Sequence, residues 1–214
     1  MTDEVEMYKT GKCYIIGGGE NYGLNFKQQE GDYIIAADAG YKYLKEAGIT
    51  ADLVVGDFDS LEYVPNHPGT VKLNPVKDET DTWEAVRLGM EKGYRDFHFY
   101  ACTGGRIDHT IANIQLLKSV AEKGCRGYLY DKKSVLTVIN NSDIKFDDPM
   151  CGYISVFSLS DKSMGVTIKG LKYEVEDAVL DNSFPLGVSN EFTGTDSEIS
   201  VSEGSLLIVY PRTE

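Results

Sequence analysis

The fold is decided by the stretch Asp52-Leu53-Val54-Val55-Gly56-Asp57-Phe58-Asp59-Ser60. It opens with a short, nearly continuous apolar run, which is typical of a strand buried on both faces of a parallel sheet. Two carboxylates, Asp57 and Asp59, follow that run directly. Open α/β sheets bind ligands outside the carboxyl ends of their strands. The stretch therefore predicts both the kind of sheet and the edge that carries the chemistry.

Similar apolar runs alternate with helix-like segments on both sides of this stretch, from Lys12 to about Tyr130. Such alternation predicts an α/β domain that is doubly wound and mostly parallel. Gly48, Gly93 and Gly124 follow the three predicted helices and end them. The strands are predicted at residues 13–16, 33–37, 53–55, 71–73, 96–101 and 128–130, and the helices at 41–47, 81–92 and 108–123.

Apolar residues at helical spacing predict which face of each longer helix is buried. In the helix at 81–92 the spacing puts Trp83, Val86 and Met90 on one face. In the helix at 108–123 the inward-facing residues are expected to be Ile111, Ile114, Leu117 and Ala121.

After about Ser134 the pattern changes to short alternating segments with turn residues between them, and no helical period returns. This pattern predicts an antiparallel β-sandwich. We therefore expect two domains, an α/β domain at residues 1–135 and a β-sandwich at residues 136–214. Clear examples of the alternating segments are residues 153–159, 166–168, 199–201 and 206–210.

The composition favours a folded cytoplasmic protein. Hydrophobic residues make up 42% of the 214 residues, and no apolar stretch approaches the roughly 20 residues that a membrane span needs. We expect no secretory signal, because the N-terminus is acidic, and we expect reduced cysteines, because the four cysteines lack zinc spacing. A net charge of −13 argues against nucleic acid or an anionic membrane as partner. A cationic small molecule would be attracted.

The spacing of Asp57 and Asp59 predicts a site for a hard cation. In a turning segment both carboxylates can chelate one ion, and Asp81, at the next strand end, adds a third oxygen. Mg²⁺ takes a few carboxylates together with phosphate oxygens, and it offsets the repulsion between crowded carboxylates. The alternatives are an Asx turn at Asp57 and a helix N-cap at Asp81, with Glu84 completing a capping box.

Two glycine-containing segments predict contacts to phosphate groups. Gly17-Gly18-Gly19 lets the backbone approach a ligand with free N–H groups, although a tight turn explains it equally well. Gly104-Gly105-Arg106 precedes a helix whose N-terminus, together with the guanidinium, forms an anion site. Its alternative is a surface arginine with Asp108 as N-cap. Asp38 lies about 20 residues after the first glycines, where a ribose-binding acid sits.

Several motifs occur along the chain in a specific order. They are 37–40 (Ala-Asp-Ala-Gly), the opening stretch at 52–60, 77–81 (Lys-Asp-Glu-Thr-Asp), 104–109 (Gly-Gly-Arg-Ile-Asp-His) followed by Asn113, 170–173 (Gly-Leu-Lys-Tyr) and 187–192 (Gly-Val-Ser-Asn-Glu-Phe). On these motifs the chain resembles the thiamine pyrophosphokinases over nearly its full length. The resemblance implies an α/β domain followed by a β-sandwich, and a homodimer with active sites between subunits. It also implies a Mg²⁺-dependent reaction in which ATP and thiamine give AMP and thiamine diphosphate.

The resemblance also assigns roles to residues. Asp38, Asp57, Asp59 and Asp81 are implied to be catalytic, the last three as Mg²⁺ ligands. Phe192 is the nearest aromatic for the pyrimidine ring of thiamine, with an ordinary core aromatic as the alternative. The residues assigned to ATP are Gly18, Lys77, Asp78, Thr80, Arg106, Asp108 and His109, and those assigned to thiamine are Ser189 and Asn190, which from the sequence alone read as a polar turn.

Two other functions remain open. A glycosyltransferase or nucleotidyltransferase would use Asp57 and Asp59 to hold the metal of a nucleotide-sugar, but the small size of the chain and the later Ser189-Asn190 segment argue against it. A non-catalytic nucleotide-binding module would bind a nucleotide without forming AMP.

Overall fold

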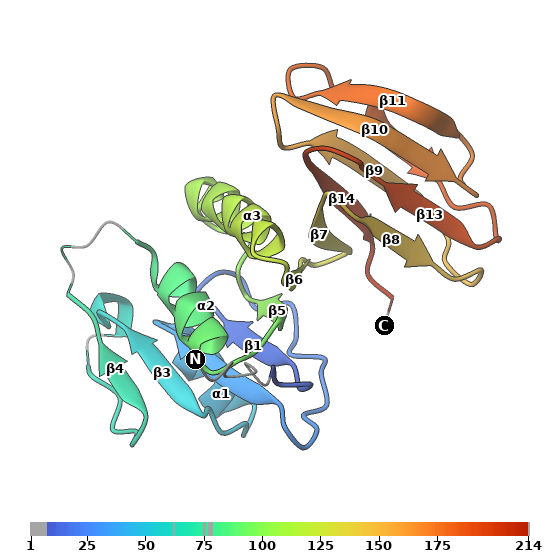
Figure 1. The fold of residues 1–214 in the computed structure, drawn as a ribbon. Helices are drawn as coiled ribbons and strands as arrows, with labels where there is room; N and C mark the ends of the chain where they lie inside the picture. The colour runs from blue at the N-terminus through green and yellow to red at the C-terminus, as the bar shows by residue number, and fades with distance from the viewer. Residues whose placement is uncertain (1–7, 62, 75, 77–78, 214) are drawn as a thin grey trace, which may run out of the picture. The chain divides into compact units, whose positions relative to one another are not determined.

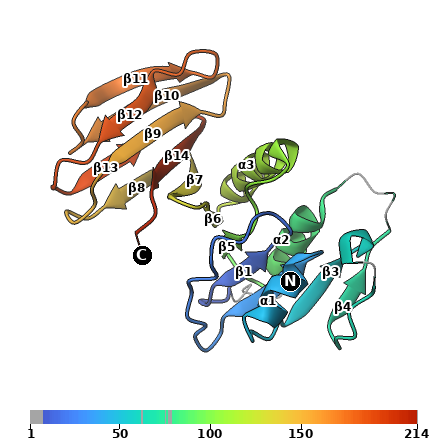
Figure 2. The same cartoon turned by 180° about the vertical axis from the view of Figure 1, so that it is seen from behind.

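The structure, a computed structural model, describes residues 8–61, 63–74, 76 and 79–213. The chain forms two compact units, and each contains a hydrophobic core cluster. The first unit comprises Met1–Asn113 with Leu129–Asp131, and the second comprises Ile114–Tyr128 with Lys132–Glu214. Figures 1 and 2 show the strands β1 to β5 of the first unit in blue to green and the later strands in yellow to red. The division after residue 135 stays a proposal.

The first unit contains a parallel sheet. β1 (Cys13–Ile16) lies between β2 (Tyr33–Ala37) and β5 (Asp96–Tyr100), and β3 (Leu53–Gly56) and β4 (Thr70–Lys72) extend the sheet beyond β2. All four neighbouring pairs among these strands are parallel. The apolar runs are buried along their length, because both faces of the sheet are covered. The prediction of an α/β unit with parallel strands is confirmed, and its doubly wound description stays a prediction.

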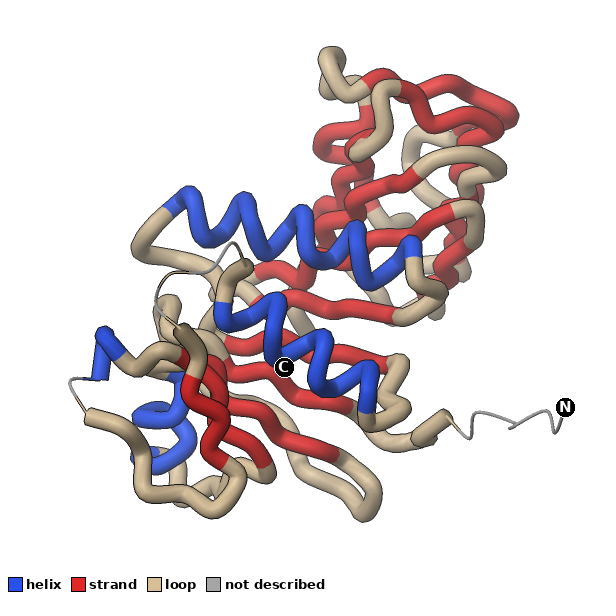
Figure 3. The backbone as a smooth tube through the Cα atoms, turned by 60° about the vertical axis from the view of Figure 1, so that its left-hand side comes forward, coloured by secondary structure: helices blue, strands red, loops and turns tan. Residues whose placement is uncertain are grey.

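Helices α1 (Gly40–Glu46) and α2 (Asp81–Glu91) cover opposite faces of this sheet. Side chains of α1 join the core cluster that contains Tyr14. On α2, an added Cβ at Gly89 would lie only 3.0 Å from Cys13 Sγ. Cys13 and Tyr14 are consecutive in β1, so their side chains point to opposite faces. Figure 3 shows α2 as a blue helix running beside the red strands.

The buried face of α2 differs from the prediction. Ala85, Val86 and Gly89 are buried, whereas Trp83 and Met90 are only half-buried. The two large side chains on the predicted face are therefore less buried than Val86 and the small residues beside it. Small residues let a helix lie close to a sheet, and this moves the line of contact away from the larger side chains.

The buried face of α3 (Ile107–Glu122) also shifts. Ile111 is 52% exposed, which corrects its predicted inward placement, and Ile114 is half-buried. The buried line begins at Asn113, whose side chain donates to Cys102 O at 2.8 Å. A pattern built from apolar residues misses a buried amide of this kind. The other buried residues of α3 are Leu116, Leu117, Val120 and Ala121.

The second unit contains antiparallel strands in two groups, ordered β12-β9-β14-β7 and β11-β10-β13-β8. Every neighbouring pair within these groups is antiparallel. One core cluster joins Ile154 and Leu206 of the first group to Val166 and Ile199 of the second. The predicted antiparallel second half is confirmed, and the name β-sandwich stays a prediction. The strands are β7 (Ser134–Asn140), β8 (Asp143–Phe146), β9 (Tyr153–Ser158), β10 (Lys162–Lys169), β11 (Val175–Asp181), β12 (Gly187–Glu191), β13 (Ser197–Ser200) and β14 (Ser205–Pro211), and β6 (Arg126–Tyr130) precedes them.

Among the described residues, no helix has the length and apolar character that crossing a membrane requires.

Replacing Leu44 with alanine tests the core of the first unit. Leu44 is fully buried in a cluster with Ile34 and Val54. Truncating a buried leucine costs about 2–5 kcal/mol, so Leu44→Ala is expected to lower the urea midpoint of unfolding clearly. The control Val179→Ala removes a side chain that is 54% exposed and is expected to change stability by less than about 0.5 kcal/mol. Equal stability of both variants would contradict this placement of α1.

Candidate active site

Three carboxylates meet at the carboxyl edge of the parallel sheet. Asp38 directly follows β2, Asp57 directly follows β3, and Asp81 is the first residue of α2. One carboxylate oxygen of each lies within 4.8 Å of the other two. We term these three residues the acidic cluster. The parallel pairing of β2 and β3 produces it, because the carboxyl ends of both strands reach the same edge.

Asp38 combines a strained backbone with an unpaired oxygen. Its φ is 49°, in the left-handed region, and its N–H donates to Val55 O at 2.8 Å. Its Oδ1 atom is buried and has no hydrogen-bond partner. Gly56 makes room for it, since an added Cβ there would lie 3.1 Å from Asp38 Cα. A buried, unpaired carboxylate oxygen is destabilising, and a divalent cation offsets that cost. The acidic cluster therefore fits a hard metal ion.

Of the two carboxylates that the sequence paired in the turn after β3, only that of Asp57 joins the acidic cluster. Phe58, which is 3% exposed, has a φ of 65°. Asp59 N donates to Asp57 Oδ1 at 3.1 Å, so the Asx turn considered as an alternative is present. Asp59 itself is exposed, begins the short 3₁₀ helix η1 (Asp59–Leu61) and lies outside the acidic cluster. Its role as a metal ligand stays a prediction.

Thr80, rather than Asp81, caps α2. Trp83 N donates to Thr80 Oγ1 at 3.1 Å. Asp81 occupies the first turn, where a negative charge is favourable beside the helix N-terminus, and its carboxylate joins the acidic cluster. The alternative of an N-cap at Asp81 is therefore wrong. Thr80 as an ATP contact stays a prediction, and Lys77 and Asp78 lie outside the described residues.

The glycine run after β1 binds the neighbouring chain segment. Gly17 N donates to Tyr100 O at 2.9 Å, and Gly19 N donates to Ala101 O at 2.7 Å. The expectation of free N–H groups for a phosphate is therefore wrong for these two residues. Close approach does require glycine, since an added Cβ on Gly19 would lie 2.8 Å from Ala101 O. The assignment of Gly18 to ATP stays a prediction.

The turn before α3 presents an exposed ion pair. Gly104 and Gly105 have φ values of 77° and 61°. Arg106 Nε and Nη2 then donate to Asp108 Oδ1 and Oδ2 at 3.2 and 2.5 Å. The guanidinium lowers the pKa of the Asp108 carboxyl below its usual value. This two-point geometry of Arg106 is the one that also binds phosphate. His109 is exposed and donates its backbone N–H to Asp108 Oδ1 at 3.1 Å.

The predicted thiamine residues lie on β12 of the second unit. Ser189 has a φ of 60°, and its N–H donates to Ser155 Oγ at 3.0 Å. Asn190 is 6% exposed; its amide donates to Tyr173 O at 2.7 Å and accepts from Tyr173 N at 2.9 Å. Asn190 thus fixes the backbone of Tyr173, whose side chain is 61% exposed. Phe192 is buried in the core, which agrees with the alternative that it is an ordinary core aromatic.

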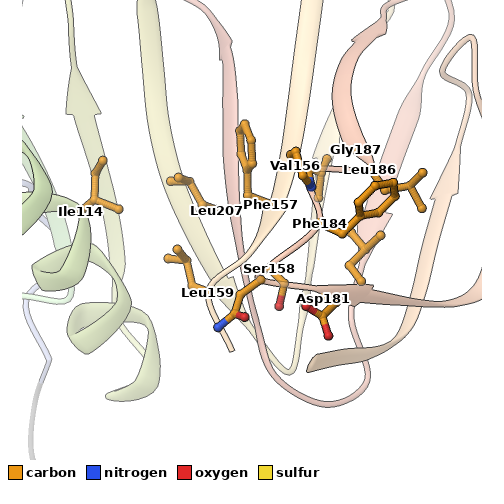
Figure 4. Close-up of a pocket in the computed structure, with 13 residues that line it drawn as sticks. Ile114, Val156, Phe157, Ser158, Leu159, Asp181, Phe184, Leu186, Gly187 and Leu207 are labelled. Atoms are coloured by element: carbon orange, nitrogen blue, oxygen red, sulfur yellow. The ribbon is translucent and has the colours of Figure 1, made fainter. Parts of the chain in front are cut away.

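A cavity of about 320 Å³ opens in the second unit. Its wall is mostly apolar and is formed by α3, β9, β14 and the turn between β11 and β12 (Figure 4). Phe157, Leu159, Phe184 and Leu186 are among its lining side chains. No carboxylate of the acidic cluster and no residue assigned to ATP or thiamine lines it.

Two residues connected with these segments escaped prediction from the sequence. Asp131 directly follows β6 and accepts a hydrogen bond from Thr103 Oγ1 at 2.6 Å. The signal was present, because Asp131 follows the strand predicted at 128–130 in the same way that Asp57 follows its strand. Tyr173 ends the motif 170–173, which contributed to the resemblance, but no role was predicted for it because a single aromatic in a turn belongs to no periodic pattern.

Two family models match the chain. Residues 26–129 match the model for the thiamin pyrophosphokinase catalytic domain, and residues 141–206 match the model for the thiamin pyrophosphokinase vitamin B1 binding domain. The fold and the acidic cluster define a class of two-part enzyme, in which an α/β unit with an acidic site is followed by an antiparallel β unit. The chain belongs to the thiamine pyrophosphokinase family, a family of transferases.

Known relatives agree with this assignment. The chain is 28% identical to thiamine pyrophosphokinase from Bacillus subtilis (strain 168) over 183 residues, which cover 82% of this chain and 85% of the relative. The crystal structure of a thiamine pyrophosphokinase from Bacillus subtilis matches with a TM-score of 0.84 at 26% identity, over 95% of this chain and 100% of that one. The crystal structure of thiamin pyrophosphokinase from Geobacillus thermodenitrificans gives a TM-score of 0.81 at 27% identity, over 95% and 98%.

Metal binding by the acidic cluster can be measured without turnover. An ion that binds only the folded state stabilises it, so Mg²⁺ is expected to raise the melting temperature of the wild type. Asp38→Asn is expected to abolish this rise, because it removes a charged oxygen from the cluster. The control Asp161→Asn changes an exposed residue of the second unit and is expected to keep the rise.

The rise is compared within each variant, since Asp38→Asn also relieves repulsion between carboxylates and changes the metal-free stability. If Asp59→Asn abolishes the rise and Asp38→Asn preserves it, the acidic cluster is not the metal site.

Proposed function

We propose that the protein transfers the diphosphoryl group of ATP to the hydroxyl group of thiamine, giving thiamine diphosphate and AMP. The observation that carries this proposal is the meeting of Asp38, Asp57 and Asp81 within the segment that matches the family's catalytic domain. The names of the relatives support the same activity.

The proposed cofactor is Mg²⁺, held by the acidic cluster with Asp59 as a further candidate ligand. When bound, Mg²⁺ neutralises the charge of the phosphate oxygens of ATP. The buried, unpaired Oδ1 atom of Asp38 supports a cation at this position. A hydrogen-bond donor from the protein would have satisfied that oxygen but would also have occupied the place of the ion.

In the proposed reaction, the hydroxyl oxygen of thiamine forms a bond to the β-phosphorus of ATP. The bond between that phosphorus and the oxygen bridging to the α-phosphate breaks, and AMP leaves. The hydroxyl proton passes to a carboxylate of the acidic cluster. Arg106 and Lys77 offset the charge on the bridging and leaving oxygens. Positioning and charge neutralisation then supply most of the catalysis.

The thiamine site is proposed to include Ser189, Asn190 and the exposed ring of Tyr173. The side-chain amide of Asn190 is hydrogen-bonded to the backbone of Tyr173, so Asn190 acts by holding Tyr173 in place. Tyr173 replaces Phe192 as the proposed aromatic partner of the pyrimidine ring, because the ring of Phe192 is buried. The net charge of −13 favours the cationic thiazolium ring through long-range attraction.

The proposed assembly is a homodimer whose active sites combine the first unit of one chain with the second unit of its partner. Exposed apolar side chains on the second unit offer surface for such an association, including Phe184 at 64% and Leu186 at 62% exposure. The exclusion of nucleic acid as a partner rests on the net charge, and the cytoplasmic location stays a prediction from composition.

The reaction is tested by incubating the purified protein with ATP, Mg²⁺ and thiamine. AMP and thiamine diphosphate are expected in equal amounts, measured by chromatography. Asp57→Asn is expected to lower turnover at least ~100-fold, because charge stabilisation at a phosphoryl centre is a large part of catalysis, while the circular dichroism spectrum is retained. ADP as the nucleotide product would contradict the proposal. ATP binding without AMP would instead support a non-catalytic module.

The aromatic assignment is tested with two substitutions at Tyr173. Tyr173→Ala is expected to raise the KM for thiamine about 3- to 10-fold, since an aromatic pair contributes roughly 0.5–1.5 kcal/mol. Tyr173→Phe keeps the ring and is expected to stay near wild type, and the KM for ATP is expected to be unchanged in both variants. The control Tyr8→Ala removes another exposed tyrosine. If Tyr173→Phe behaves like Tyr173→Ala, the hydroxyl group and not the ring is responsible.

A further inference from the structure

The chain leaving β5 is held along its backbone. Ala101 has a φ of 52°, so the chain turns sharply at the strand end. From residue 100 to residue 103 each carbonyl accepts a hydrogen bond from the segment 17–20 or from α3. The bonds are Gly17 N to Tyr100 O at 2.9 Å, Gly19 N to Ala101 O at 2.7 Å, Asn113 Nδ2 to Cys102 O at 2.8 Å and Glu20 N to Thr103 O at 2.9 Å.

Asp131 adds a side-chain bond at the end of this segment. Thr103 is 4% exposed, and its Oγ1 donates to Asp131 Oδ1 at 2.6 Å. A hydrogen bond to a carboxylate is stronger than one between neutral groups. Because Gly104 comes next in the chain, this bond fixes the point at which the following turn begins.

The turn Gly104-Gly105-Arg106 is closely packed against neighbouring residues at Gly104 and has free space around Gly105. An added Cβ at Gly104 would lie 2.7 Å from Tyr22 Oη and 2.8 Å from Glu20 Cβ. An added Cβ at Gly105 would meet nothing within 4 Å. The Arg106 side chain beyond it is 73% exposed. A long exposed side chain reaches a ligand at a low cost in ordering only if its backbone origin is fixed.

We infer that Thr103 and Asp131 are positioning residues for Arg106. Their hydrogen bond sets where the turn leaves the sheet, and through Arg106 it sets the affinity for the phosphate groups of the nucleotide. Neither side chain touches the nucleotide in this scheme. The inference rests on the proposed function in one respect, since it takes ATP as the ligand of Arg106.

The test measures equilibrium binding of ATP in the presence of Mg²⁺, together with KM and kcat. Thr103→Val keeps the shape of the side chain and removes the donor. It is expected to raise the Kd and the KM for ATP about tenfold, because Arg106 must then be ordered when the nucleotide binds, while kcat changes less than about threefold. Thr103→Ser keeps the hydroxyl group and is expected to restore wild-type values.

A matched control is Thr137→Val in the second unit. Thr137 is buried, and its Oγ1 donates to Gly127 O at 2.8 Å. Its substitution removes a bond from a buried threonine hydroxyl to a neutral carbonyl and is expected to lower the melting temperature without changing the Kd for ATP. Asp131→Asn keeps an acceptor but removes the charge, so it is expected to weaken ATP binding less than Thr103→Val. If Thr103→Val does not fold, Asp131→Asn tests the same hydrogen bond through its effect on the Kd for ATP.

A double-mutant cycle separates positioning from a general structural effect. If Thr103 acts through Arg106, adding Thr103→Val to Arg106→Ala is expected to change the Kd for ATP less than about twofold. A tenfold loss in both backgrounds overturns the inference, and so does an unchanged Kd in Thr103→Val alone.

Because ATP binding is measured directly, failure of the positioning role can be distinguished from failure of the proposed function. A wild type that binds ATP but forms no AMP overturns the function, and the cycle still decides the positioning role. A wild type that binds no ATP overturns both.

Discussion

Repulsion among three carboxylates at one edge of the parallel sheet is the constraint on which the rest of the structure depends. The register that pairs Ala37 with Val55 brings Asp38 beside Asp57, and α2 adds Asp81. Like charges at this separation destabilise one another. Hydrogen bonds to Asp38 Oδ1 would have reduced that cost, yet the atom is buried without one. The fold therefore leaves Asp38 Oδ1 without a hydrogen bond, and a bound cation would offset the cost of burying it.

The buried strands of the first unit could be predicted from the sequence, but three strands that lie at the ends of their strand orders could not. Residues 13–16 and 33–37 form strands with the predicted bounds, because a strand buried on both faces needs an unbroken apolar run. β8, β11 and β12 were not predicted, and each lies at an end of its strand order. An edge strand has a neighbour on one side only, and most of β11 is exposed or half-buried. Its residues therefore need neither a continuous nor an alternating apolar pattern, and its pairing depends on distant parts of the chain.

The acids of the candidate site could be found from the sequence, but their partners could not. Each acid follows a predicted strand or opens a helix, and that rule identified all three members of the acidic cluster. Spacing along the chain then paired Asp57 with Asp59. In the structure Asp38, which follows the neighbouring strand, joins Asp57 in the acidic cluster, and Asp59 does not. Which carboxylates meet depends on the pairing of neighbouring strands, and a residue pattern does not show that pairing. The same applies to the bond between Thr103 and Asp131.

A chain with a net charge of −13 repels anions over its surface as a whole, so in the proposed function a cation for ATP must be presented locally. Arg106 is presented with its guanidinium already in two-point contact with Asp108. When a phosphate replaces that carboxylate, the guanidinium exchanges one two-point hydrogen-bond acceptor for another. The Arg106 side chain therefore loses little further conformational freedom. Asp108 is 60% exposed, so water solvates it once it is released. The pair therefore lowers the affinity for anions in general and favours those that match the planar fork. In the proposed reaction, negative charge makes binding selective at two places. The acidic cluster repels ATP that carries no metal ion, and Asp108 repels anions that cannot displace it from Arg106.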